Sequence, residues 1–212
     1  MFSVYIISIR TDLRLKEILS KIREINKIRE INKNNNKNNN KNSDKNSDKN
    51  SELLIGAFNE EYVISRDHIK FAIFHAKKAF ETSTNISKSF ELEALLRAAC
   101  TRQIEKAIEL IGVKDPNNIV LGIYKENKGN KENKGDKNKE NKENKENNEI
   151  KKSELNRILR DLKSKKKEWT EPKVGEERDG ERVKRIIKVF NLDPKKDLSE
   201  QIIEKMIELQ IY

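Results

Sequence analysis

The chain has 212 residues, of which 39% are charged and 34% apolar, and its formal net charge at pH 7 is +10. This apolar fraction is low for a single globular domain. The shortage is local, because residues 32–51 and 125–149 contain no apolar side chain. Such segments cannot bury enough surface to offset the entropy lost on ordering. We therefore expect one domain over residues 1–212, interrupted by two disordered insertions, 32–51 and 125–149.

Several classes of protein are excluded by the same composition. No apolar run approaches the ~18–20 residues of a membrane-spanning helix, and the N-terminal residues lack the pattern of a secretory signal. Cys100 is the single cysteine, which excludes an internal disulfide and a cysteine zinc site. We expect a cytoplasmic protein. The basic balance favours a nucleic-acid partner, although the simpler interpretation of the two insertions is that they are solvated and have no function.

The N-terminal part predicts a strand followed by a helix and a hairpin. The β-branched run 4–9 is typical of a buried strand. Asp12 can cap a helix that begins at Leu13 and continues to the first insertion. The runs 53–58 and 62–64 flank a short polar segment, which predicts a hairpin.

Three helices and a strand are predicted in the middle of the chain. A largely buried helix over 68–81 follows Ser65 or Asp67, either of which can cap it. A second apolar helix covers 90–100. Thr101 is placed to cap a third helix over 102–111, which Gly112 ends. The run 119–124 predicts a strand.

The C-terminal part predicts three more helices. Apolar spacing indicates helices over 155–162 and 183–190, with the basic stretch Lys163–Lys167 between them. Asp197 and Glu200 form a capping box for the last helix. The whole order predicts an α/β (α+β) fold, a single mixed domain of about four strands packed with helices. The order of the strands in the sheet cannot be predicted from these patterns.

We find no motif for catalysis. The chain lacks a phosphate-binding glycine loop and the HExxH, GxSxG and CxxC motifs. His68 and His75 are seven residues apart on one predicted helix, roughly 10 Å along its axis, which is too far to bind one metal ion. The favoured interpretation of Cys100 is a packed thiol. We therefore expect no enzyme activity, no metal and no cofactor.

Three blocks in a fixed order carry a family resemblance. They are LLIGAFNEEYVISRDHIKFAIFHAKKAF, then KSFELEALLRAACTRQIEKAIELIGVKDPNNIVLGIY, then IKVFNLDPKKDLSEQIIEKMIELQIY at the C-terminus. Together the blocks resemble the small regulatory subunit of the KEOPS complex, the family of the PRPK-binding protein, in its archaeal form. The two insertions depart from the family pattern, and they fall between predicted elements.

The resemblance implies a function that composition does not show. KEOPS makes threonylcarbamoyladenosine in tRNA, and members of this family bind and regulate the protein kinase of the complex without being catalytic. Archaeal members also resemble a tRNA-recruiting subunit that holds the single-stranded CCA 3′ end. The resemblance therefore implies two partners, the KEOPS kinase and tRNA, and indirect association with the other KEOPS subunits. It implies a mixed α/β fold.

A few residues near the most family-like helices are candidates for contact with tRNA. A single-stranded 3′ end needs phosphate contacts and a surface on which bases stack, and a helix N-terminus also favours phosphate. Phe90 is the nearest aromatic side chain on which a base could stack. The alternative is that Phe90 belongs to the core and that the neighbouring cations are simply solvated. The basic stretch Lys163–Lys167 could contact the tRNA backbone, but a solvated loop is the default interpretation. The candidates are Lys88, Ser89, Phe90, Arg97 and Arg102.

The last helix is a candidate for contact with the kinase. Its apolar residues cover more than the ~100° stripe that packing on one side requires, which suggests a partner surface. Simple core packing is the alternative. We assign Ile203, Met206 and Ile207 to the contact and expect Ile203 and Ile207 to face the kinase, while positions 202, 206 and 209 form the neighbouring stripe.

Two further functional hypotheses stay open beside the KEOPS interpretation. One is a protein–protein regulator of a kinase that makes no contact with RNA, its basic balance supplied by the insertions. The other, which is weaker, is a small enzyme whose site has no recognisable motif. Binding of tRNA with and without its CCA end separates the regulator without RNA contact from the KEOPS interpretation. A test for ATP hydrolysis addresses the enzyme hypothesis.

Overall fold

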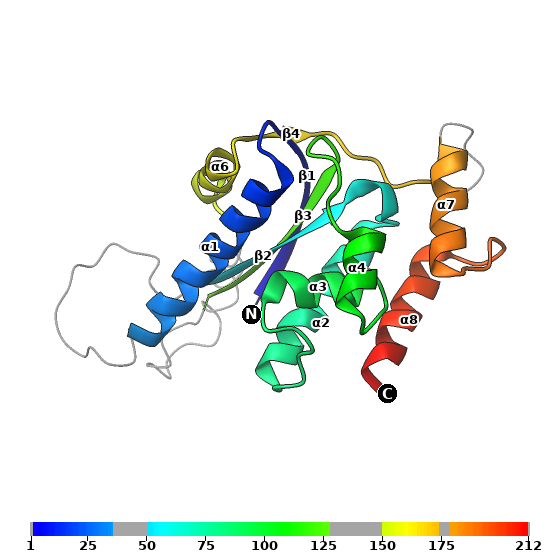
Figure 1. Cartoon of the computed structure of the whole chain (residues 1–212), viewed down its shortest axis with the longest axis horizontal. Helices are drawn as coiled ribbons and strands as arrows, with labels where there is room; N and C mark the ends of the chain where they lie inside the picture. The colour runs from blue at the N-terminus through cyan, green and yellow to red at the C-terminus, as the bar shows by residue number, and fades with distance from the viewer. Residues whose placement is uncertain (1, 36–50, 128–149, 174–178, 212) are drawn as a thin grey trace, which may run out of the picture.

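A four-stranded antiparallel sheet forms the centre of the protein, with helices on both of its faces (Figure 1). The computed structural model describes residues 2–35, 51–127, 150–173 and 179–211. The strand order is β2-β3-β1-β4, which confirms the predicted α/β class of about four strands. The strands are β1 (Phe2–Thr11), β2 (Ser51–Asn59), β3 (Ile119–Asn127) and β4 (Ser164–Lys167).

Each face of the sheet buries its own apolar core. The strands alternate side chains between the two faces, so that Ile6 packs on one side and Ile7 and Ile9 on the other. On the second side lie α1 (Leu15–Asn35) and α6 (Lys152–Asp161), which contribute Ile18 and Ile158. This arrangement explains why β2 and β3 contain near-continuous apolar runs.

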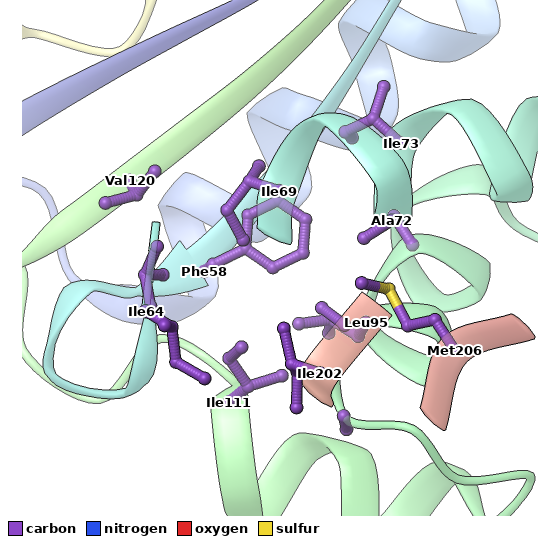
Figure 2. Packing of buried hydrophobic residues seen from close by; sticks show 14 of the residues in the cluster. Phe58, Ile64, Ile69, Ala72, Ile73, Leu95, Ile111, Val120, Ile202 and Met206 are labelled. Atoms are coloured by element: carbon purple, nitrogen blue, oxygen red, sulfur yellow. The ribbon is translucent and has the colours of Figure 1, made fainter. Parts of the chain in front are cut away.

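The larger core joins the sheet to the remaining helices (Figure 2). Phe58 and Val120 of the sheet meet Ile69 of α2, and Leu95, Ile202 and Met206 continue the same cluster outward. The helices that form it are α2 (Arg66–Glu81), α3 (Phe90–Ala98), α4 (Ile104–Ile111), α7 (Gly180–Phe190) and α8 (Leu198–Ile211).

Two paired glycines let α2 lie close to the sheet. Gly56 of β2 is directly opposite Gly122 of β3, and both face Ile73 of α2. A Cβ atom at Gly122 would stand 2.6 Å from Cγ1 of Ile73, and one at Gly56 would stand 2.9 Å from its Cδ1. The missing side chains therefore provide the space that Ile73 fills.

Two of the predicted helix caps are confirmed. The Ser65 hydroxyl accepts a hydrogen bond from the backbone N–H of His68 at 3.1 Å, at the start of α2. Asp197 accepts one from the backbone N–H of Glu200 at 2.8 Å, at the start of α8. Local side-chain chemistry decided both helix starts.

Three local predictions are wrong. The segment after 58 forms no hairpin: β2 pairs with the distant β3, and a 3-10 turn over Glu60–Tyr62, called η1, follows it. The helix predicted at Arg102 begins at Ile104, because the Thr101 hydroxyl accepts a hydrogen bond from the N–H of Gln103, the residue immediately before the helix. The first helix begins at Leu15, beyond the reach of Asp12 as a cap.

The predicted margins of the insertions also need correction. Residues 32–35 belong to α1, Ser51 to β2 and 125–127 to β3. Lys125 is 2% exposed and pairs with Glu154 of α6 at 2.9 Å. Composition assigns Lys125 to the insertion, but this tertiary contact makes it part of the folded domain. The rest of the predicted disorder, over 36–50 and 128–149, lies outside the described residues.

The basic stretch is a strand rather than a loop. Residues 164–167 form β4, which pairs antiparallel with β1 at the edge of the sheet. The Thr11 hydroxyl of β1 donates to the carbonyl oxygen of Leu162 at 2.7 Å and holds the entry to β4. No apolar alternation signals this strand, because its pairing with β1 comes from the tertiary structure.

Candidate functional site

The segment that enters α3 is held by a buried carboxylate. Glu93 is fully buried, and its Oε2 accepts hydrogen bonds from the backbone N–H groups of Ile86 and Ser87, each at 2.8 Å. Its other oxygen accepts from Arg97 Nε at 2.9 Å. The two backbone groups and the guanidinium together compensate the buried charge. This arrangement fixes the segment that presents Lys88 to solvent.

Two of the five candidate RNA contacts lie inside the protein. Arg97 is 4% exposed and its guanidinium is engaged by Glu93. Phe90 is 5% exposed and packs near Phe80 in the core, with their ring centroids 6.4 Å apart. Neither side chain presents a surface to RNA here, so the alternative core position describes Phe90 correctly. Sequence spacing could not show this, because helix periodicity does not reveal a buried ion pair.

The other three candidates remain accessible to different degrees. Lys88 and Arg102 are exposed, whereas Ser89 is partly buried and its Oγ has no hydrogen-bond partner among the described residues. The guanidinium of Arg102 donates through Nη2 to the carbonyl oxygen of Leu209 at 3.3 Å. Arg102 therefore lies where the α3–α4 connection meets the end of α8.

A cavity of about 440 Å³ lies beside Arg102, between the α3–α4 connection, the end of α7 and α8. Lys106 and Lys205 line it together with Glu208, over an apolar wall that includes Leu110 and Phe190. The cavity combines two cations and one carboxylate with an apolar wall.

Cys100 also lines this cavity, with a left-handed φ of 50°. Its Sγ lies 3.7 Å from the carbonyl oxygen of Ile202. Burial raises the pKa of the thiol to about 12. A thiol with this pKa is protonated at neutral pH and is a poor nucleophile, so Cys100 serves packing, as predicted.

The exposed side of α4 was missed by sequence reasoning. Ile104 and Ile108 are 37% and 47% exposed, one turn apart on the same side of the helix. Ala107 and Ile111 have the same spacing and are buried. The sequence analysis predicted this helix without dividing its apolar residues into two stripes, and only the tertiary structure shows which pair faces the core.

The outer side of α8 carries a second apolar surface. Ile202 and Met206 are fully buried, whereas Ile203 is partly buried and Ile207 is 43% exposed. Ile207 lies away from the core, as predicted, whereas Ile203 packs against the core cluster and keeps only part of its surface exposed. Met206 needs correction, because its side chain packs inside this chain (Figure 2) and offers no surface to a partner. We call Ile203 and Ile207 the α8 outer stripe.

The two histidines do not form a site. His68 is fully buried, accepts from Ile64 N–H through Nδ1 at 3.3 Å and meets the Ala98 carbonyl through Nε2 at 2.9 Å. Burial lowers the pKa of His68 to about 4. His75 instead stacks on Phe71 on the outer side of α2, with ring centroids 5.7 Å apart.

Two searches of the described residues bear on the kind of site. No group of three or more His, Cys, Asp or Glu side chains there is arranged to hold a metal ion. No helix in the same part of the chain is long and apolar enough to cross a membrane.

Comparison with known proteins identifies one family. The family model described as "Kinase binding protein CGI-121" matches residues 34–210. The chain is also similar to "Regulatory protein Cgi121" of Methanocaldococcus jannaschii, with 44% identity over 59 residues. That alignment covers 28% of this chain and 38% of the length of the relative.

Proposed function

The chain belongs to the CGI-121 family of kinase-binding proteins, and from that premise we propose that it is the non-catalytic regulatory subunit of a KEOPS complex. In this function it binds the protein kinase of the complex and recruits tRNA by the CCA 3′ end, for the synthesis of threonylcarbamoyladenosine. The observation that carries the proposal is the presence of two separate surfaces, one apolar on α8 and one basic and apolar around α4.

The α8 outer stripe supports the contact with the kinase. Exposed apolar side chains on an otherwise packed helix indicate a surface that a partner covers. Its position on α8 also separates it from the cavity, because Lys205 and Glu208 line the cavity from the other flank of the helix. The kinase and an RNA end can therefore bind to α8 from different directions.

The α3–α4 region supports the contact with the tRNA end. A single-stranded 3′ end is bound by cations at its phosphates and by flat or apolar surfaces at its bases. Arg102 supplies a guanidinium that can do both, and Lys88 supplies a second exposed cation. Ile104 and Ile108 supply exposed apolar surface on the adjoining helix.

A gel-shift series tests the tRNA part of the proposal. The full chain is mixed with mature tRNA, with tRNA lacking CCA and with tRNA carrying a changed anticodon. We expect removal of CCA to weaken binding far more than the anticodon change. Arg102→Ala should cost on the order of 1–3 kcal/mol of binding free energy for mature tRNA. Equal binding of all three RNAs would contradict recognition of the 3′ end.

A kinase regulator without RNA contact is the second candidate. It would retain the α8 outer stripe as its working surface, and the cations near α4 would be solvated. A pull-down from native cytoplasm, probed for the KEOPS kinase and for tRNA, separates the candidates. Recovery of the kinase with no tRNA, in the presence and absence of ribonuclease, would favour the second.

A further inference from the structure

Positive charges face each other across the edge of the sheet. The register of β1 and β4 places Arg10 directly opposite Lys165, and Ile9 opposite Lys166. Arg10, Lys165 and Lys166 are all exposed, and none of them has an ion-pair partner among the described residues. Lys163, also exposed, precedes β4 with a left-handed φ of 45°. We call these four residues the β1–β4 basic edge.

This arrangement opposes the stability of the sheet. Like charges directly opposite on neighbouring strands are destabilising, and lysine is depleted in strands. The left-handed φ of Lys163 belongs to the end of α6, where its N–H donates to the Arg160 carbonyl oxygen at 2.9 Å. The remaining lysine of β4 behaves differently. Lys167 pairs with Glu60 at 3.2 Å and donates to Asn118 Oδ1 at 2.8 Å, so it serves the fold.

Protection of an open sheet edge explains only part of the pattern. Lysine on an edge strand prevents pairing with other chains, which accounts for a cation in β4. It does not account for Arg10, because Arg10 belongs to β1, an inner strand. A carboxylate at this position would pair with Lys165, and the lysines of β4 would still protect the edge. Two exposed acids, Asp12 and Glu168, adjoin the edge in sequence, and Glu60 lies beside it but is paired with Lys167. The four cations therefore exceed the nearby negative charges.

We infer that the β1–β4 basic edge is a binding surface for the phosphate backbone of double-helical RNA. Arg10 and Lys165 share one face of the sheet, whereas Lys166, opposite Ile9, belongs to the other face. Cations along both sides of an edge suit contact with phosphates without reading bases. Arg10 lies on the sheet face to which Ile6 and Ser8 belong, the face that α2 covers.

This inference rests on the proposed binding of tRNA and assigns it a second, sequence-independent contact. Under this assignment, the α4 region holds the single-stranded end while the edge holds a helical stem. The contribution of the edge should then be the same for any tRNA, with or without CCA.

The experiment compares R10Q/K165Q with the wild-type chain and with K188Q, which removes an exposed lysine on α7. Affinity for mature tRNA and for tRNA lacking CCA is measured between 50 and 300 mM salt. We expect the affinity of the double variant for both RNAs to fall by the same factor. The slope of log affinity against log salt should fall by about 0.7–0.9 for each lost phosphate contact. K188Q should leave affinity and slope unchanged.

A second variant separates binding from folding. R10E places a carboxylate opposite Lys165, so its melting temperature should equal or exceed that of the wild type while its affinity for RNA falls. A lower melting temperature would show that Arg10 stabilises the fold and would overturn the argument.

The outcomes distinguish this inference from the proposed function. An unchanged salt slope in R10Q/K165Q, or a loss confined to RNA with CCA, overturns the inference and leaves recognition of the 3′ end intact. A loss of kinase binding with RNA binding unchanged shows that the edge contacts an acidic protein surface, which also overturns it. Another outcome is that the wild type binds tRNA with and without CCA equally, while R10Q/K165Q still lowers the affinity for both RNAs and the slope of log affinity against log salt. In that case the inference holds and 3′-end recognition fails.

Discussion

Glu93 and Arg97 show how a charged pair serves the fold at a position that sequence reasoning assigned to RNA. Both side chains are within 5% of complete burial, and Glu93 also receives two backbone N–H groups. Removing one member of such a pair leaves the other charge buried and uncompensated. The pair therefore supports the RNA proposal only indirectly, by fixing the segment that carries Lys88.

Arg97→Ala should lower the free energy of unfolding by about 3–5 kcal/mol, because buried Glu93 loses its guanidinium partner. The matched control is Arg157→Ala, which breaks the exposed pair with Asp161, where the side chains are 67% and 44% exposed. That change should cost about 0–1 kcal/mol. Urea denaturation measures both, and equal effects would show that burial of the first pair contributes nothing.

His68 makes stability depend on pH in a defined window. Its pKa is about 4 in the folded protein and 6.5 in the unfolded chain, so the unfolded chain binds the proton first as pH falls. The stabilisation that neutral His68 gives is complete above pH 6.5 and is lost progressively down to pH 4. The difference corresponds to on the order of 3 kcal/mol.

The control for this prediction is His68→Gln, which keeps a donor and an acceptor but cannot titrate. Thermal melts at several pH values between 4 and 7 should show a smaller decrease toward low pH in the variant. A decrease of the same size would mean that other groups cause the acid sensitivity.

At the scale of the element, α8 divides its residues between the core and the surface. Ile202 and Met206 are fully buried, and Ser199 Oγ lies 2.6 Å from Ser65 Oγ, where the starts of α8 and α2 meet. This anchoring sets the rotation of α8 about its axis, which the apolar spacing left undecided between two neighbouring stripes. Ile207 is thereby placed in solvent, and Ile203 lies at the margin of the core.

Ile207→Glu should fold normally and lose binding to the kinase, because a charge would enter an apolar contact that excludes water. The matched control is Ile108→Glu, at a similarly exposed isoleucine on α4. This variant should keep its binding to the kinase and lose affinity for tRNA. Circular dichroism melting and a kinase pull-down are made on the same preparations. A folded Ile207→Glu protein with full kinase binding would remove α8 from the interface.

For the whole molecule, the C-terminal helices are tied to the sheet through the turn that follows β2. Arg182 of α7 donates through Nη2 to the carbonyl oxygens of Glu60 and Val63, at 2.7 and 2.9 Å. Glu60 in turn accepts from Ser8 of β1 and from Lys167 of β4. One turn therefore connects both edges of the domain, and none of these connections passes through the insertions.

Replacing residues 36–50 and 128–149 by a few Gly and Ser residues should therefore change stability little. The composition of these segments offers no apolar surface to bury, and loop length alone has a small entropic effect. We expect the melting temperature to stay within about 10 °C, a limit that corresponds to several kcal/mol in a domain of this size. A larger decrease, or loss of kinase binding, would show that the segments take part in the folded structure.

The sequence by itself determined the elements that depend on neighbouring residues. The spacing of apolar residues identified most of the helices and three of the strands, and short polar side chains marked the starts of α2 and α8, because both signals arise within a few residues. Three blocks in a fixed order also indicated the family. These signals are local, and they required no knowledge of the tertiary structure.

Only the tertiary structure decided what depends on residues far apart in the chain. It paired β2 with β3 in place of a hairpin, made a strand of an all-polar segment by pairing it with β1, and buried Arg97 against Glu93. It also chose which stripe of α4 and of α8 meets the core. Pairing partners and the direction of burial are set by contacts across the whole fold, and no local pattern records them.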